Sequence, residues 1–448
     1  MSTPAIIVNA KQRAGNGQEP DAIRLLSLDV FRGATIALMI LVNNPGDEQT
    51  AYWPLKHAEW NGWTPTDLVF PFFLFIVGVS MAFSFSSRLK RGETRHQLIV
   101  HVMKRGLILL ALGIFLNGFP NHYHLSTWRF YGVLQRIAIC YVIAASLVLW
   151  TGRRGWIIAI VSCLAGYWIL MRFIPVPGYG IPKHDIPLLD SDRNMAAWLD
   201  RKLLMGHLYE GTRDPEGVLS TIPAIATTLL GVLTGEWLRS ERGAQAKAAG
   251  MAFMGVAALG LGEFLNNWFP INKKLWTSSY VVFTAGFALV CLAICYWTLD
   301  VKHWRRGTLP LLVFGANPIA AYFFAEIVAH WIDRVQVQSA GWFNDVAGDD
   351  LPAAVCGVHQ PGEFCTAVFT SLRLNVLVAD VAPVSSQGFS EDLIYKACFT
   401  RNSDLDPARN CCILTSYFLI PAQSDRLPDP VTSVTLVSLT PMLGSLNL

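Results

Sequence analysis

The sequence predicts an all-α polytopic membrane protein, a bundle of about nine transmembrane helices. Of its 448 residues, 52% are hydrophobic and only 15% are charged, which is too little charge to cover a soluble particle of this size. Uncharged runs of spanning length recur along the chain, and Trp and Tyr gather at their edges, as they do at membrane interfaces. The expected spans lie near residues 33–46, 68–87, 106–121, 137–152, 155–171, 217–235, 248–262, 275–299 and 308–325.

The second and ninth runs give the most local detail. From Leu68 to Ser87 the chain has 20 consecutive uncharged residues, enough helix to cross a hydrocarbon core of about 30 Å. Thr64-Pro65-Thr66 precedes this run as a helix-capping segment. In the ninth run, Asn317-Pro318 follows Gly315 and predicts an interruption, either a break that opens backbone groups toward a cavity or a tolerated kink.

The positively charged residues indicate how the helices are oriented. Every second connection is basic, and these connections lie near residues 88–95, 153–154, 239–247 and 302–306. Lys and Arg are retained on the cytoplasmic side of a membrane, so we expect a cytoplasmic N-terminus. The other connections are then outside, namely the segment around His57 and residues 118–129, 172–216 and 267–274.

The two ends of the chain differ from the bundle. Residues 1–24 are polar, contain Gly and Pro, and lack an apolar run before a small-residue cleavage site, which predicts a disordered cytoplasmic tail and no secretory signal. Residues 343–448 have a net charge of −6, five of the nine cysteines and no Trp, whereas the preceding residues sum to +9. We therefore expect residues 336–448 to be an atypical, poorly structured extension.

Composition and motifs exclude several classes of function. The net charge of +3 is explained by membrane orientation, so nucleic-acid binding has no support. The chain has no Gly-x4-Gly-Lys-Ser/Thr, His-Glu-x-x-His or Gly-x-Ser-x-Gly sequence. Cys356, His359 and Cys365 match no strong zinc spacing, and Cys411-Cys412 adds no second ligand pair, so we expect no metal site.

A polar and aromatic segment directly before the second span is the best functional lead. Residues 52–63 offer Lys, His, Glu and Asn beside four aromatic residues. His57 is the titratable group of this segment, and Asp67 follows at the head of the next helix, where its carboxylate can orient an imidazole by hydrogen bonding. The alternatives are an exposed interfacial histidine without special duty and a helix acid favoured by the dipole.

Arginines near two helix starts are candidate ligands. Arg24, Asp29 and Arg32 fall at helical spacing, so they can hold one another and still present guanidinium to phosphates. Positive-inside anchoring with a helix-entry salt bridge is the alternative. Arg136 lies in the first turns of an apolar helix, where an unpaired charge is costly, so it needs either an ion pair or a polar cavity. The acids in or bordering spans are Asp67, Glu236, Glu263 and Glu326.

Aromatic and amide side chains at the outer face are candidate sugar ligands. Trp60 and Asn61 belong to the segment of His57, and a second set follows the seventh span. Aromatic rings with amides and hydroxyls hold sugar rings, although any aromatic belt supplies the same residue types. The second set consists of Asn267, Lys273, Trp276, Ser279 and Tyr280.

Five segments together form a specific combination of motifs. They are Arg24 to Gly33, Lys56-His57-Ala58-Glu59-Trp60-Asn61-Gly62, Asp67-Leu68-Val69-Phe70-Pro71, Gly132-Val133-Leu134-Gln135-Arg136, and Asn272-Lys273-Lys274-Leu275-Trp276-Thr277-Ser278-Ser279-Tyr280. This combination resembles the bacterial relatives of heparan-alpha-glucosaminide N-acetyltransferase, a family of multi-helix transmembrane acyltransferases. The resemblance covers residues 24–335.

The resemblance implies a transmembrane acyltransferase fold over residues 25–335 and a place in the bacterial inner membrane. Members of the family take acetyl from cytosolic acetyl-CoA and deliver it to the amino group of a terminal glucosamine on the far side of the membrane. Their catalytic histidine corresponds to His57, with Asn43 and Asp67 as further catalytic positions. We expect acetyl-CoA as co-substrate near Arg24, Arg32 and Arg136, an amino-sugar acceptor and membrane lipid as partners, and no metal. A homodimer is one option for the assembly.

The chain departs from the resemblance after residue 335. The relatives continue there into further transmembrane helices, whereas this sequence turns acidic and non-spanning. A frameshifted or otherwise altered C-terminus would explain the change. Losing one or two helices from a packed bundle could abolish activity while leaving every motif intact.

Two other functions fit the same residues. An amino-sugar transporter would also place polar residues in spans and a broken helix at Asn317-Pro318, although the sequence shows no obvious inverted repeat. A non-catalytic scaffold would need neither His57 nor Arg136. The sequence also leaves open whether His57 takes the proton of the amine in a direct transfer or is itself acetylated in a two-step transfer.

Overall fold

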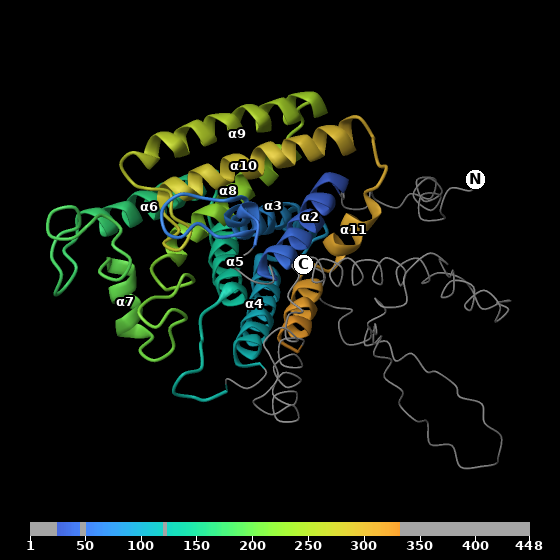
Figure 1. Ribbon diagram of the computed structural model, residues 1–448. Helices are drawn as coiled ribbons and strands as arrows, with labels where there is room; N and C mark the ends of the chain where they lie inside the picture. The colour runs from blue at the N-terminus through green and yellow to red at the C-terminus, as the bar shows by residue number, and fades with distance from the viewer. Residues whose placement is uncertain (1–24, 45–50, 120–122, 332–448) are drawn as a thin grey trace, which may run out of the picture. The chain divides into compact units, whose positions relative to one another are not determined.

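The computed structural model describes residues 25–44, 51–119 and 123–331, and the regular elements in these ranges are helices (Figure 1). Eight helices are long and apolar enough to cross a membrane, and the bent pair Leu309–Ala316 and Pro318–Trp331 makes a ninth if it is one span. In the described residues, β-structure is limited to two isolated bridges, Val176 with Gly180 and Pro182 with Ile186. The protein is therefore an all-α polytopic membrane protein, as the sequence predicts.

Short connections join most of the helices. The long exception lies between α6 (Arg153–Arg172) and α8 (Thr221–Arg239), and it contains a short amphipathic helix, α7 (Met195–Leu203), that was not predicted from the sequence. The segment before α3 contains the 3-10 turns η2 (Trp53–Leu55) and η3 (Pro65–Leu68), and α10 ends in the π-helical turn η4 (Trp297–Val301). The α-helices are α2 (Leu26–Asn43), α3 (Val69–Lys90), α4 (Arg95–Gly118), α5 (Val133–Trp150), α6 (Arg153–Arg172), α7 (Met195–Leu203), α8 (Thr221–Arg239), α9 (Ala244–Asn266), α10 (Ser278–Tyr296) and α11 (Leu309–Ala316).

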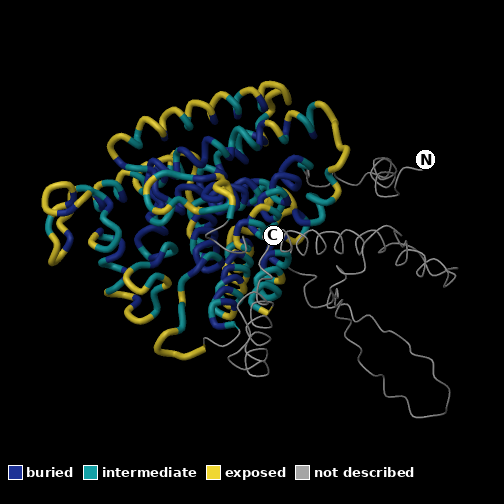
Figure 2. The backbone as a smooth tube through the Cα atoms, viewed as in Figure 1, coloured by how far each residue is buried: buried dark blue, intermediate teal, exposed yellow. Residues whose placement is uncertain are grey.

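Helices α3 and α8 form the centre of the bundle. In the spanning window of α3, 83% of the residues are buried, against 22% for α9 and 17% for α6, so these two present most of their surface outward (Figure 2). Around the centre, α10 packs on α9, α4 on α5, and α11 on α2. A Cβ on Gly78 would lie 1.9 Å from Thr228 O, and a Cβ on Gly231 would lie 2.0 Å from Phe75 O. Glycines at this crossing therefore let the two backbones touch, which is how helices associate tightly in lipid.

The first span starts earlier than its uncharged run, because its charged residues are partnered. The run begins at residue 33, but the helix begins at Leu26. Arg32 Nη1 lies 3.4 Å from Asp29 Oδ1 and donates to Gly315 O at 3.3 Å, and its Nη2 donates to Ser80 Oγ at 2.6 Å. The guanidinium thus ties α2 to α3 and α11, and a charge held in this way can lie inside a spanning helix.

The predicted interruption of the ninth span is confirmed. Leu309–Ala316 and Pro318–Trp331 meet at an angle of 89°. Asn317 has φ of −133° and ψ of 63°, which is not helical. This is the expected effect of the following proline, whose ring disfavours the α conformation in the residue before it.

The connections separate into two groups, in line with the alternating charges. At one end, a cavity of about 440 Å³ is lined by the ends of α3, α5, α6 and α8 and includes Lys90 and Arg239 from two basic connections. At the other end, the segment of His57 is joined to the connection before α10, where Gly62 N donates to Ile271 O at 2.8 Å. The tip of the connection between α6 and α8 reaches the same end through the hydrogen bond of Trp60 Nε1 to Leu189 O, 2.7 Å.

Several expectations fall outside the described residues. These are the tail at residues 1–24 and the extension at residues 336–448, with its Cys and His residues. Within the residues that the structure describes, no group of three or more His, Cys, Asp or Glu side chains could hold a metal ion.

We expect Gly78→Leu to destabilise the bundle, because its side chain would collide with the backbone of α8 and force the two helices apart. Overpacking a core costs about 1–3 kcal/mol, so the thermal midpoint of the purified protein in detergent should fall. Gly260→Leu in α9 is the matched control, since a Cβ at Gly260 meets nothing within 4 Å. Equal midpoints for the two variants would contradict this account of the crossing.

Candidate active site

Asp67 holds the segment before α3 in place. The Asp67 side chain is 1% exposed, and its Oδ2 accepts hydrogen bonds from Ala58 N at 3.0 Å, Thr64 N at 3.0 Å and Thr64 Oγ1 at 3.1 Å. With Thr64 as N-cap and Pro65 in the first turn, these bonds form a capping box that starts η3. The single proton of Thr64 Oγ1 is shared between Asp67 Oδ2 and Lys56 O, the latter 2.6 Å away, so the loop from Lys56 to Thr64 closes beside this one carboxylate.

The second oxygen of the same carboxylate orients His57. Asp67 Oδ1 lies 2.7 Å from His57 Nδ1. Because an ionised carboxylate only accepts hydrogen bonds, we assign the Nδ1 proton to the imidazole, which leaves a lone pair on Nε2. The His57 side chain is 47% exposed, so this lone pair is open to a solute. Asp67 therefore caps the helix and orients the histidine at once. The helix-start acid and the histidine-orienting acid, which the sequence offered as alternatives, are the same residue in both roles.

Lys273 reaches the same imidazole from the connection between α9 and α10. Its Nζ lies 3.0 Å from His57 Nδ1, 3.2 Å from Nε2 and 3.6 Å from Asp67 Oδ1. An amine at nearly equal distances from both ring nitrogens lies over the face of the imidazole, so the in-plane lone pair of Nε2 stays free. The Lys273 side chain is 20% exposed, and burial lowers its pKa against the opposing attraction of Asp67. The site thus combines an oriented imidazole, a buried carboxylate and an amine.

The segment that carries Lys273 is fixed by its neighbour Asn272. Asn272 is fully buried, and its Nδ2 donates to Asn61 Oδ1 at 3.3 Å. Its Oδ1 accepts from Leu275 N at 2.9 Å, which closes the turn into α10. Asn61, predicted as a sugar ligand, therefore also links the two segments of the site.

Three of the predicted sugar ligands lie in the packed interior beneath these segments. Trp276, Ser279 and Tyr280 are each at most 1% exposed. Tyr280 donates its hydroxyl to Asp67 O at 2.5 Å, and the Trp276 ring packs edge-on against Phe70 and Tyr280. Trp276 also has φ of 53°, a left-handed conformation that is rare for a bulky residue and persists only where packing enforces it. These residues support Asp67 and the start of α3 from below.

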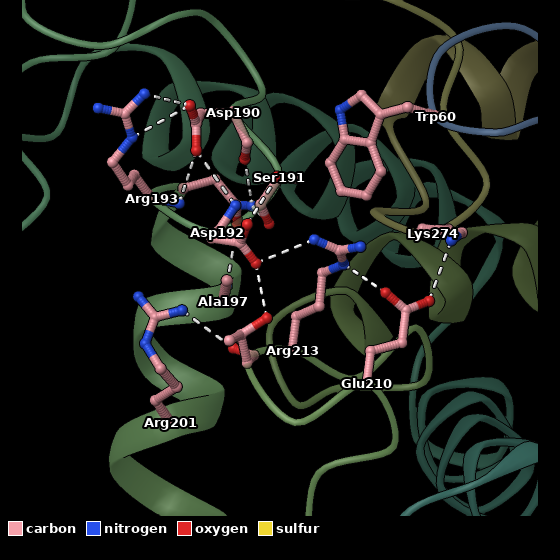
Figure 3. Close-up of polar contacts among 12 residues, drawn as sticks. Trp60, Asp190, Ser191, Asp192, Arg193, Ala197, Arg201, Glu210, Arg213 and Lys274 are labelled. Atoms are coloured by element: carbon pink, nitrogen blue, oxygen red, sulfur yellow. Dashed lines mark hydrogen bonds and ion pairs between the residues drawn. The ribbon is translucent and has the colours of Figure 1, made fainter.

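A network of ion pairs in the connection between α6 and α8 covers Trp60 (Figure 3). The Arg213 guanidinium lies over the Trp60 ring, 4.9 Å from its centroid, and pairs with Glu210 at 2.5 Å and Asp192 at 2.9 Å. Glu210 also pairs with Lys274 at 3.0 Å. The network therefore joins the segment that contains His57 and Trp60 to the segment that contains Lys273 and Lys274.

Arg136 is fully buried, and no acidic residue pairs with it in the described part of the chain. Its Nη2 donates to Pro215 O at 3.0 Å, Gly217 O at 3.3 Å and Ser220 Oγ at 2.5 Å. The guanidinium lies over the Trp276 ring, 5.1 Å from its centroid. Its Nε and Nη1 have no hydrogen-bond partner among the residues that the structure describes. Backbone oxygens and a hydroxyl thus take the place of the ion pair that the sequence left open.

The remaining predicted residues lie apart from the imidazole. Asn43 ends α2, and its Nδ2 donates to Glu326 Oε1 at 2.8 Å. Asn267 follows the end of α9 and donates back to that helix. Arg32 is held among α2, α3 and α11, and Arg24 lies outside the described residues. In the described part of the chain, no hydrogen bond joins Asn43, Asn267 or Arg32 to the histidine.

The sequence analysis missed two parts of this site. The contact of Lys273 with His57 joins residues 216 positions apart, so no local spacing marks it. The Glu210–Arg213 pair lies in the connection between α6 and α8, for which the sequence predicted only a loop. The one local feature that indicates this ion pair is the spacing of opposite charges at i and i+3.

The chain is similar to proteins of known type. Residues 24–263, more than half of the chain, match the family described as "Heparan-alpha-glucosaminide N-acetyltransferase, catalytic". Heparan-alpha-glucosaminide N-acetyltransferases of Homo sapiens and Mus musculus are each 33% identical over 365 residues, covering 69% of this chain and 53% and 54% of the relatives. The chain thus spans about half the length of the curated relatives it matches.

We expect Asp200→Asn to stabilise the protein more at neutral than at acidic pH. Asp200 Oδ1 accepts from Val218 N at 2.9 Å, beside the turn that binds Arg136. The pKa of Asp200 is raised from 3.8 to about 6, first by burial and then by the charge of Asp214, against the hydrogen bond from Val218 and the charges of Arg136 and Arg201. A raised pKa means stability that is present below pH 3.8 and lost as pH rises through 6, at most about 3 kcal/mol. The difference in thermal midpoint between variant and wild type should therefore be larger at pH 7.5 than at pH 4.5.

The control for this prediction is Asp185→Asn. The pKa of Asp185 is lowered from 3.8, by the hydrogen bond from Ile181 N and then by His184, so its contribution to stability is present above pH 3.8 and is lost only at lower pH. The midpoint difference between Asp185→Asn and the wild type should therefore be nearly the same at pH 4.5 and pH 7.5. An Asp200 variant whose effect does not grow between pH 4.5 and pH 7.5 would show that the buried carboxylate is not the source.

Proposed function

Because this chain belongs to the heparan-alpha-glucosaminide N-acetyltransferase catalytic family, we propose that it is a membrane acyltransferase. It moves acetyl from cytosolic acetyl-CoA to the amino group of a glucosamine-type sugar on the outer side of the membrane, and residues 25–335 form its acyltransferase domain. The names of the relatives support an N-acetyltransferase with a glucosaminide acceptor. The observation that carries the proposal is the half-exposed His57, 2.7 Å from the buried Asp67.

His57 Nε2 is the atom at which we place the chemistry. In a direct transfer, Nε2 takes a proton from the amine as the amine bonds to the acetyl carbon, and the proton passes to the CoA thiolate as the C–S bond breaks. In a two-step transfer, Nε2 itself bonds to the acetyl carbon as the C–S bond breaks and CoA leaves as a thiolate. The amine then bonds to the acetyl carbon and displaces Nε2, and the proton that the amine loses passes to the thiolate. Asp67 holds the ring in either case. Asn43 remains the proposed donor to the thioester oxygen, in exchange for its hydrogen bond to Glu326.

We place the basic end of the bundle in the cytoplasm, with the N-terminus inside and the protein in a bacterial inner membrane. The phosphates of acetyl-CoA meet Arg24 and Arg32 on that side. Arg136 is the proposed polar contact deeper in the bundle, because two of its nitrogens have no partner. The thioester then approaches His57 from within the bundle.

The acceptor sugar approaches from the outer side. Trp60 and Asn61 are the proposed first contacts, since both lie in the segment of His57 and Asn61 is exposed. Asn267 and Lys273 are further proposed ligands on this side. The proposed set of sugar ligands also includes three buried residues, Trp276, Ser279 and Tyr280. They act through the contacts that hold the exposed residues in position.

One observation favours the alternative, an amino-sugar transporter. The ninth span is bent by 89°, and broken helices are common where transporters bind their substrates. A transporter releases the sugar chemically unchanged, whereas an acetyltransferase releases an N-acetyl product. The chemical form of a labelled sugar therefore separates the two functions.

We expect His57→Ala to abolish acetyl transfer from labelled acetyl-CoA to glucosamine by the purified protein in lipid vesicles. A positioned acid–base group contributes about 10²- to 10⁴-fold to rate, so the variant should lose at least about 10²-fold in kcat. Expression and membrane insertion of the variant should stay at the wild-type level, because the imidazole is 47% exposed and is not part of the packed interior.

His184→Ala is the matched control for this experiment. His184 Nδ1 lies 2.6 Å from Asp185 Oδ1, but the His184 side chain is 81% exposed and its carboxylate partner is 42% exposed, whereas Asp67 is buried. Its replacement should leave turnover at the wild-type level. Unaltered turnover in His57→Ala would sink the proposed chemistry, and labelled sugar accumulating unmodified in wild-type vesicles would favour the transporter.

A further inference from the structure

Asp67 orients His57 without help from Lys273, so this orientation does not explain the position of Lys273. Asp67 already accepts four hydrogen bonds, from His57 Nδ1, Ala58 N, Thr64 N and Thr64 Oγ1. Lys273 Nζ is 3.6 Å from Asp67 Oδ1 but only 3.0 and 3.2 Å from the two ring nitrogens. A lysine that served only to neutralise the carboxylate would lie closer to its oxygens. The amine instead lies over the face of the imidazole, 3.2 Å from Nε2.

We propose that Lys273 is a catalytic residue, whose ammonium stabilises the negative charge that develops on the thioester oxygen during acetyl transfer. This inference rests on the proposed function, since it adds a group that acts on the same reacting carbon. An acetyl carbon that bonds to Nε2, or to an amine hydrogen-bonded to Nε2, carries its oxygen into the immediate surroundings of that nitrogen. A cation fixed 3.2 Å from Nε2 is already there before the charge forms.

The reaction step is balanced with Lys273 keeping its own proton. The amine nitrogen bonds to the thioester carbon, and the carbonyl electron pair moves to the oxygen, which accepts a hydrogen bond from Lys273. The carbonyl then re-forms, the C–S bond breaks, and CoA leaves as a thiol with the proton that His57 took from the amine. In a two-step transfer the same oxyanion forms twice, and one proton again passes from the amine to the thiolate.

The charged groups around Lys273 give this role a pH signature. Lys273 faces His57, Asp67, Glu216 and Lys274. Burial lowers the pKa of Lys273, Asp67 and Glu216 oppose this, and Lys274 lowers it further. Lys273 therefore loses its charge at a lower pH than an ordinary lysine, whose pKa is 10.5. Activity that depends on the ammonium should fall with rising pH before that value.

The test compares Lys273→Met and Lys273→Arg with the wild type in the acetyl-transfer assay. Lys273→Met keeps the length of the side chain and removes the charge, so kcat should fall by about 10²- to 10³-fold, as for the loss of an oxyanion donor, with KM little changed. Lys273→Arg restores a cationic donor and should recover most of kcat. Lys202→Met on α7 is the matched control, because Lys202 is exposed at the protein surface and should behave as wild type.

The pH profile of kcat adds a readout that a structural role would not move. With both substrates saturating, the wild type should lose activity on the alkaline side with a midpoint below 10.5. In Lys273→Arg this midpoint should move to higher pH, because a guanidinium keeps its proton.

The outcomes separate this inference from the proposed function. A wild-type kcat in Lys273→Met, or a rise in KM alone, overturns the inference while acetyl transfer by the wild type upholds the function. No transfer by the wild type overturns the function itself. If Lys273→Met fails to fold, as its thermal midpoint would show, the arginine variant decides, and an unmoved alkaline midpoint in Lys273→Arg overturns the inference.

Discussion

A carboxylate buried at the edge of the second span is the constraint on which the rest of the site depends. An ionised Asp that is 1% exposed is costly unless its oxygens are filled by donors. Asp67 fills one oxygen with backbone and hydroxyl donors of the preceding loop and the other with the imidazole of His57. The path of the loop, the start of α3 and the tautomer of His57 are thus three consequences of one solvation requirement. Helix capping and the proposed chemistry share a residue because both need an acceptor at this point.

The distance between the imidazole and the amine is set by tertiary contacts, because His57 and Lys273 are 216 positions apart. Backbone pairing of Gly62 with Ile271 and the side-chain hydrogen bond of Asn272 to Asn61 fix the two segments directly. The outer connection adds a cover of ion pairs over both segments, and it is itself tied to the chain before α5, where the guanidinium of Arg129 bonds two carboxylates. Rigid support on several sides is what keeps reactive groups within the few tenths of an ångström that chemistry requires.

Local physics made the part of the site that lies in one segment predictable, and little beyond it. Asp67 follows capping residues at the head of an uncharged run, so both its helix role and its reach to His57 could be derived from spacing. The contact of Lys273 depends on how α9 and α10 place their connection, which no local pattern encodes. The partners of Arg136 include backbone oxygens, which any residue supplies, so the sequence could not identify them. From the sequence, the only specific partner that could be considered was an acidic side chain. Uncharged runs likewise located the spans but not their ends, because partnered charges extend helices and α7 is too short to show as a run.

The buried guanidinium of Arg136 connects this outer site to the interior of the bundle. Arg136 lies over the ring of Trp276, Trp276 packs against Tyr280, and Tyr280 bonds to the backbone oxygen of Asp67, so a continuous set of contacts runs from the cation to the backbone of Asp67. Two nitrogens of Arg136, Nε and Nη1, have no hydrogen-bond partner in the described structure, and burying such groups costs free energy that an ion pair would have offset. An anionic or carbonyl-bearing ligand that reached these two nitrogens would offset the same cost. This is the physical reason to keep Arg136 on the proposed path of the acetyl donor.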